Sequence, residues 1–208
     1  VPAYDLRLSG IAAEAHLSGA RLDPERSVPV SIAAVAHGGT PAWFGPLRLQ
    51  GSVQPRDGQI AFDATATQAG GAVELRVQGL HDLAGGTGRA RLHLPPIELA
   101  PARLQVGQLS PWLGDFVRDA SGRLALNGSV AWGAGERPRA ALEMLVQDLG
   151  FGAGPARFEQ VNGVIALDGL VPPSTPPGQQ LAVGLVDVGL PLINGLVTFD
   201  LEPGELLV

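Results

Sequence analysis

The residues whose chemistry could support catalysis or metal binding are scattered along the chain. The four histidines stand alone in the sequence, and they are His16, His37, His81 and His93. None has the His-x-x-x-His or Glu-x-x-His spacing that places two metal ligands on one face. The chain has no cysteine, which excludes thiolate ligands and disulfides. We therefore expect no metal site, and we expect His16 and His93 to be solvated because they share the polar face of predicted strands with charged residues.

Carboxylates could in principle hydrolyse glycosides, a reaction that needs two of them about 5 to 10 Å apart. The candidates are Asp63, Asp168, Asp187 and Asp200. Nothing in the sequence pairs them, and Asp at a strand end or turn commonly bonds the backbone. No Gly-x-Ser-x-Gly elbow is present, and the segment from Gly85 to Gly88 lacks the Lys of a phosphate loop. We expect no catalytic residues, no enzyme activity and no cofactor.

The composition narrows the possible partners. Charged residues make up 16% of the 208 residues and hydrophobic residues 45%, with a net charge of -6. All basic residues are Arg and are spread singly, whereas a nucleic-acid interface needs clustered positive charge. Binding of nucleic acid is therefore not expected. The sequence contains no run of about 18 apolar residues, so it predicts no membrane-spanning helix.

The ends of the sequence suggest an excerpt from a longer protein. It starts at Val1 without Met and stops on the apolar segment Leu206 to Val208. We expect one module over residues 1–208, with a β-meander over 1–108 and a second part over 109–208.

Alternating apolar and polar residues predict an all-β fold. Four segments between residues 46 and 94 alternate in this way, which is typical of an antiparallel meander with one wet face. A tight turn over Pro55 to Gly58 joins the first two of them. The apolar phase reverses between Leu8 and Ile11, which requires a bulge or turn at Gly10.

Helix signals are almost absent from the sequence. The segment from Ser110 to Val117 predicts a short helical turn, with Ser110 as the N-cap and Pro111 at the first helical position. Residues 142–149 are apolar on both faces, and we interpret them as a strand. The expected fold is thus a long, curved antiparallel sheet with at most one or two short helices.

The apolar faces could be the dry interior of a β-sandwich or could line an open trough for lipid tails. Aromatic residues are only 5% of the chain, and the apolar positions are mostly Leu, Val and Ala. Large aromatic side chains dominate most protein cores. A smooth lining without them suits fluid acyl chains. We favour an open, U-shaped hydrophobic groove. By alternation, the expected groove-lining residues are Leu49, Val53, Ile60, Phe62, Leu75, Leu92, Leu124, Leu126, Val130 and Trp132.

Particular segments carry a family resemblance. They are Phe158 to Gly163, Leu167 to Leu170, Thr175 to Gln179, Val188 to Leu192 with Asn194 and Gly195, and also Leu109 to Trp112 and Gly122 to Trp132. Together they resemble the C-terminal region of YdbH-type proteins, members of the AsmA-like group of Gram-negative envelope proteins. An older label ties the same region to dicarboxylate transport, which the sequence does not support because it lacks spanning helices and a buried cationic cluster.

The resemblance implies a segment of a bridge-like lipid transfer protein that carries phospholipids between the inner and outer membranes along a hydrophobic β-groove. It implies a periplasmic location, anchored in the inner membrane through a segment absent from this chain. It also implies a small outer-membrane lipoprotein as a partner that adds strands at the C-terminal end. The alternatives are a closed β-sandwich acting as a binding or adhesion module of the envelope and, less favoured, a β-solenoid enzyme acting on glycans.

Overall fold

The computed structural model describes residues 5–14, 17–18, 21–22, 26–170, 172–202 and 205–207. Strands dominate this part of the chain, and the helices in it are short. The helices are α1 (Val106–Leu109) and α2 (Pro111–Gly114); the strands are β1 (Leu6–Ala13), β2 (Leu17–Ser18), β3 (Arg21–Leu22), β4 (Val28–His37), β5 (Leu47–Arg56), β6 (Gln59–Gln68), β7 (Glu74–Asp82), β8 (Thr87–Leu99), β9 (Val117–Trp132), β10 (Arg139–Ala153), β11 (Ala156–Leu167), β12 (Gly169–Leu170), β13 (Pro173–Ser174), β14 (Gln179–Asp187), β15 (Pro191–Glu202) and β16 (Glu205–Leu207).

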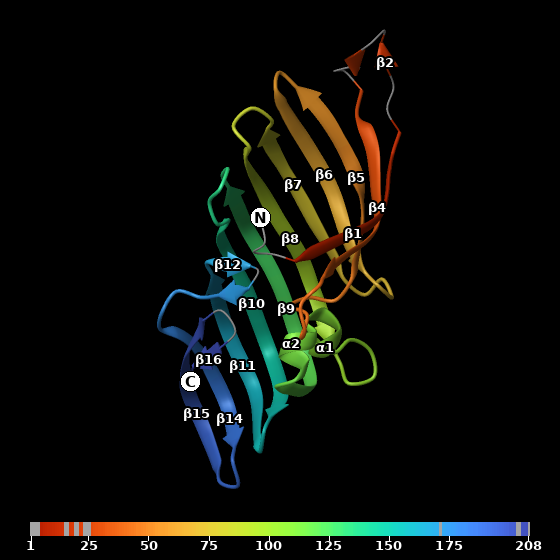
Figure 1. Ribbon diagram of the computed structural model, residues 1–208. Helices are drawn as coiled ribbons and strands as arrows, with labels where there is room; N and C mark the ends of the chain where they lie inside the picture. Colours follow the sequence, from red (N-terminus) through yellow and green to blue (C-terminus); the bar gives the residue numbers. More distant parts are fainter. Residues whose placement is uncertain are drawn as a thin grey trace.

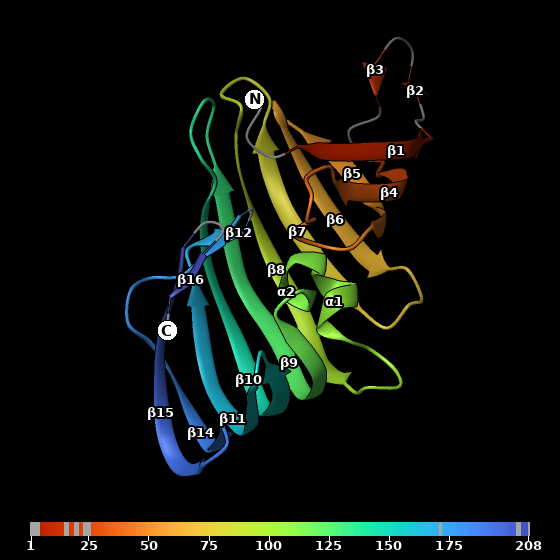
Figure 2. The same ribbon diagram turned by 60° about the horizontal axis from the view of Figure 1, so that its bottom comes forward.

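One large sheet organises the molecule. Its 12 strands follow the order β1-β4-β5-β6-β7-β8-β9-β10-β11-β14-β15-β16, while β2–β3 and β12–β13 form two-stranded ribbons. The sheet is strongly curved and stays open, with α1 and α2 on its concave face (Figures 1 and 2). The predicted all-β fold, a long antiparallel sheet with two short helices, is confirmed.

Local sequence explains the first hairpin of the meander. Strands β5 and β6 pair without interruption from Leu47 opposite Gln68 to Arg56 opposite Gln59. The two residues between them, Asp57 and Gly58, have φ values of 37° and 80°. Positive φ at both positions is what a two-residue hairpin turn with the twist of the sheet requires. The predicted turn is therefore confirmed at Asp57 and Gly58, whereas Pro55 and Arg56 still pair as the last residues of β5.

The bulge or turn expected at Gly10 does not shift the pairing of β1 with β4, which keeps one register from Leu6 opposite His37 to Ala13 opposite Val30. Gly10 has φ +63°, and a Cβ built there would lie 2.6 Å from the Cβ of Ala33 on the neighbouring strand. Strand β4 shifts its register against β5 close by, between Ile32 and Val35. A residue with a side chain would meet both backbone strain and a clash at this position, so glycine allows β1 to follow the bent β4.

The central strands are the longest and carry most of the bends. Strand β9 has 16 residues and β10 has 15, and the latter includes residues 142–149, which confirms their interpretation as a strand. Register shifts occur in β8 between Leu94 and Ile97 and in β10 between Gln147 and Gly150. Such bulges bend a strand and increase its twist.

Strand β8 precedes residue 108 and strand β9 follows it, and the two strands pair with each other. The sheet is therefore continuous across this position. The division into 1–108 and 109–208 stays a prediction.

Within the described part of the chain, no helix combines the length and apolar character needed to cross a bilayer.

The apolar concave face as candidate functional site

The two faces of the sheet differ sharply in chemistry. Cross-strand pairing through β6, β7, β8, β9 and β10 aligns residues in rows that share a face. One concave-face row is Phe62, Gly79, Ala90, Val130 and Ala140, and the next is Ala64, Val77, Leu92, Gly128 and Leu142. Between them on the opposite face runs the row Asp63, Gln78, Arg91, Ser129 and Ala141. These two concave rows of the described strands carry no charge, and the row between them is largely polar.

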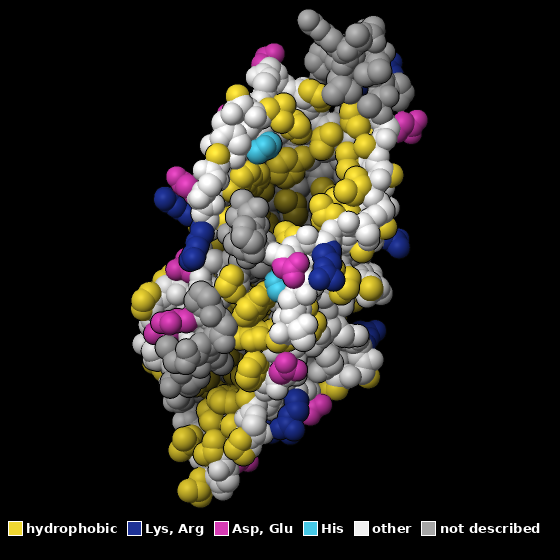
Figure 3. Space-filling view, in the orientation of Figure 1, with side chains coloured by type: hydrophobic (Ala, Val, Ile, Leu, Met, Phe, Trp, Pro, Cys, Tyr) yellow, Lys and Arg dark blue, Asp and Glu magenta, His cyan; other side chains and the backbone are white. Residues whose placement is uncertain are grey.

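The space-filling view shows where the hydrophobic side chains of the concave rows gather (Figure 3). Hydrophobic side chains gather in a hollow over β6 to β8, and a further apolar strip lies below it toward β14 and β15 (Figure 3). Charged side chains lie along both edges of this view and also near its centre, below the hollow (Figure 3). The concave face therefore offers an extended apolar surface that water can reach.

Polar contacts on the convex face confirm that it is the solvated side. The carboxylate of Asp63 accepts hydrogen bonds from Arg76 Nη2 at 2.9 Å and from Gln78 Nε2 at 2.6 Å. The bond from Arg76 and then that from Gln78 lower the pKa of Asp63, because both stabilise the charged form. His93 is exposed and its Nδ1 lies 2.5 Å from Asn127 Oδ1, as expected for a solvated histidine. His16 lies outside the described residues.

Alternation places the expected lining residues on the concave face. Leu92 is buried, and the others are half-buried. A cluster built on Ala90, Leu92 and Leu142 has around it Phe62, Leu75, Leu126, Val130 and Trp132. Leu124 packs against two further clusters. Leu49, Val53 and Ile60 belong to the same face through their pairing with Ala66, Phe62 and Pro55. Contact of these residues with lipid stays a prediction.

The helix pair α1–α2 covers part of the concave face with a dry core. Leu99 and Ala120 of the sheet are each 1% exposed and cluster with Leu104 and Val106. Ser110 caps α2 by accepting a hydrogen bond from Leu113 N at 3.3 Å, and Pro111 occupies the first turn, as predicted. Under the helix pair, the apolar residues of the sheet are therefore buried by other residues of the same chain.

Neutral hydrogen bonds hold the helix pair across the curved sheet. The side chain of Gln105 bonds both backbone groups of Ala120, at 3.0 and 3.1 Å. Gln68 Nε2 of β6 donates to Gln108 O at 3.0 Å. On the side of the β4–β5 loop, the rings of Trp43 and Trp112 lie 4.9 Å apart. The sequence did not predict the roles of Gln68 and Gln105. Gln68 follows Phe62, Ala64 and Ala66 in the apolar phase of β6, and a polar residue in that phase is the one signal that could have identified it.

Beside the helices the apolar surface continues along β10 and β11. Met144 pairs with Ile165 between the cluster of Leu142 and a third cluster built on Val146, Val161 and Val183. Neither Met144 nor Ile165 is fully buried. Partly buried apolar residues are therefore present beside the helix pair, between the cluster of Leu142 and the third cluster, which includes Val183 of β14.

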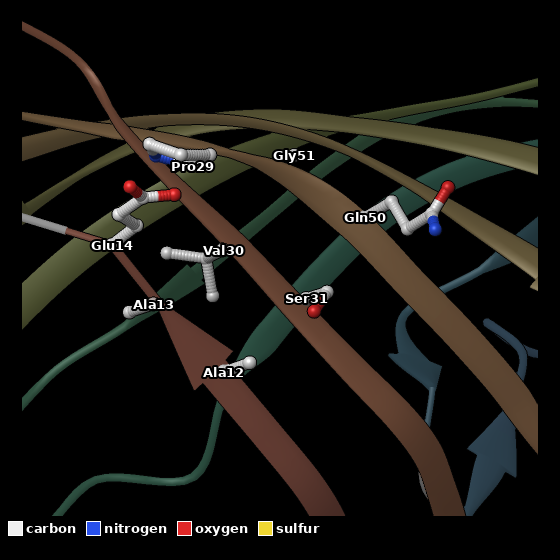
Figure 4. Close-up of a pocket in the computed structure, with 8 residues that line it drawn as sticks. All are labelled: Ala12, Ala13, Glu14, Pro29, Val30, Ser31, Gln50 and Gly51. Atoms are coloured by element: carbon white, nitrogen blue, oxygen red, sulfur yellow. The ribbon is translucent and has the colours of Figure 1, made fainter.

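Two shallow hollows lie near the N-terminal edge of the sheet. The larger, about 390 Å³, is formed by the end of β1 with β4 and β5, and its polar lining side chains are Glu14, Ser31 and Gln50 (Figure 4). The smaller, about 280 Å³, is lined by residues of β4, β5 and the β6–β7 turn. One carboxylate without a partnering acid or base does not make a catalytic centre. No group of metal-binding side chains was found in the described ranges.

These features define a class of protein: an all-β protein with an open, curved antiparallel sheet whose concave face is apolar. The chain belongs to the YdbH-like family, described as intermembrane phospholipid transport protein YdbH, which matches residues 5–208. The resemblance seen in the C-terminal segments is thus confirmed and extends over nearly the whole chain. No curated protein and no solved structure matches it.

Proposed function

We propose that the concave face carries phospholipid acyl chains as a segment of a bridge-like conduit between the inner and outer membranes. The observation that supports this most is the pair of uncharged rows across β6 to β10, backed by a polar row on the opposite face. Headgroups stay in water at the open side of the sheet. The lipid is moved without being chemically changed, so the chain acts without a catalytic step.

Single-layer architecture supports this proposal over the closed β-sandwich. In the described residues the two short helices cover part of the large sheet, and no second large sheet is present to close over it. Half-buried side chains such as Phe62 and Val130 therefore remain available to a guest. Exposed apolar surface of this extent commonly marks an interaction site.

The energetics suit transport as well as binding. Each methylene that leaves water contributes about 0.8 kcal/mol, so a long acyl chain is held firmly. The hydrophobic effect is non-directional, so it does not hold the acyl chain in one particular geometry. A lining of Leu, Val and Ala thus lets a chain slide from one row to the next with little change in free energy.

The proposed location and partners rest on the family resemblance and not on the fold. We propose that the protein works in the periplasm, anchored in the inner membrane by a segment outside this chain. A small outer-membrane lipoprotein would add strands at the C-terminal edge of the sheet. Strand β15, next to the last strand β16, carries exposed apolar residues that favour a partner there: Leu192, Ile193 and Leu196 are 62%, 70% and 69% exposed.

Lipid analysis of protein purified without detergent tests the proposal. We expect phospholipid in near-stoichiometric amounts by native mass spectrometry. Leu126→Asp places a charge on the concave face and should lose most of the lipid. Asn127→Asp adds the same charge to the convex face one residue away and should retain it. Circular dichroism and thermal unfolding establish that both variants are folded.

Absence of lipid from the unmodified protein, or equal lipid in the two variants, would contradict the proposal. An empty protein would favour a binding or adhesion module. Loss of fold in Leu126→Asp together with an empty unmodified protein would assign Leu126 to a dry core.

A further inference from the structure

At one end of the concave face, a hydrogen bond from Trp132 fixes the tautomer of His81. Trp132 Nε1 lies 3.2 Å from His81 Nδ1, and the two rings stack with centroids 6.0 Å apart and an interplanar angle of 23°. The indole nitrogen can only donate, so His81 Nδ1 must be the acceptor. The neutral imidazole therefore carries its proton on Nε2. Nε2 has no hydrogen-bond partner among the residues that the structure describes.

The backbone between the two rings is built to allow this contact. His81 on β7 and Trp132 on β9 both pair with Gly88, which lies on β8 between them. A Cβ at Gly88 would overlap the Cζ2 and Cε2 atoms of the indole. Glycine thus lets the Trp132 ring cross β8 and reach His81. Phe62, 6.4 Å from Trp132 between ring centroids, extends the aromatic platform.

The platform stands where the apolar hollow meets water. His81 is the next-to-last residue of β7, and the turn that follows contains the exposed Leu83. The adjacent concave row, with Ala90 and Val130, is wholly apolar. Aromatic rings with one polar edge favour such boundaries, as they do at membrane surfaces. A donor at such a boundary suits a lipid at the point where its acyl chains meet its headgroup.

We propose that His81 Nε2–H donates a hydrogen bond to a phosphate oxygen of a bound glycerophospholipid, with Trp132 as the residue that positions the imidazole. The lipid's acyl chains lie on the platform and on the apolar row beside it. This inference rests on the proposed function and adds a headgroup site to it. Hydrogen bonds to a charged acceptor are roughly twice as strong as neutral ones, so one such contact gives selectivity.

Binding of two lipids with identical acyl chains tests the site. The protein is loaded from vesicles containing either dioleoyl phosphatidylglycerol or dioleoylglycerol, and bound lipid is measured by mass spectrometry. His81→Phe keeps an aromatic ring and removes the donor. It should weaken phosphatidylglycerol binding about tenfold, the size of one charge-assisted hydrogen bond, and dioleoylglycerol binding less than about twofold. His93→Phe, the same change on the convex face, should alter neither.

Three outcomes would overturn the headgroup site. Equal weakening of both lipids by His81→Phe would assign His81 to packing or to an ester carbonyl. No weakening of either would remove it from the lipid site. A selective effect that His93→Phe reproduces would also contradict the site. Failure of the unmodified protein to take up either lipid would instead refute the proposed function itself.

Discussion

Truncation of Leu99 to alanine tests the division of the concave face into a sealed part and an open part. Leu99 is 1% exposed in the core between the helix pair and the sheet. The change removes three carbons, which at about 0.8 kcal/mol each gives about 2.4 kcal/mol of lost transfer free energy. The cavity left behind adds a further term, so we expect a loss of about 3 to 4 kcal/mol in the free energy of unfolding.

Leu190→Ala is the matched control, because it deletes the same atoms from a residue that is 74% exposed. Only about a quarter of this side chain is removed from water, so the loss should stay below about 1 kcal/mol. Urea unfolding followed by circular dichroism measures both variants, and equal m-values would show that the unfolded states are comparable. Similar losses for the two variants would refute the packing described for the helix pair.

Two further predictions concern polar contacts. Gln105→Leu removes both hydrogen bonds to Ala120 and should loosen the helix pair, seen as faster amide hydrogen exchange over residues 104–116; unchanged exchange would contradict its tethering role. Asp63 should titrate below its ordinary pKa in an NMR titration, since Arg76 stabilises the carboxylate, and Arg76→Gln should raise the midpoint. The stabilisation from this contact is present above the ordinary pKa and lost as the pH falls through the lowered value; a midpoint unaffected by the substitution would refute the pairing.

The sequence was sufficient for features that depend on neighbouring residues. Alternation predicted the strands of the meander, the turn within Pro55 to Gly58 followed from turn chemistry, and Ser110 with Pro111 marked the start of α2. The same alternation assigned residues such as Phe62 and Val130 to one face, because a strand has a period of two residues.

Features that depend on pairing between distant strands could not be predicted. His81 and Trp132 are 51 residues apart, and they meet only because β8 lies between their strands with a glycine at the crossing point. Gln105 likewise bonds Ala120 of another element. Register shifts in β8 and β10 add to this difficulty, since each one changes which residues face the concave side.

Site-specific photo-crosslinking in cells tests the central claim most directly, that acyl chains contact the concave face. A benzoylphenylalanine at Val130 points to the apolar side, and one at Ser129 points to the opposite side of the same strand. We predict phospholipid adducts at position 130, identified by mass spectrometry, and none at position 129. Adducts at neither position, or equal adducts at both, would contradict the account.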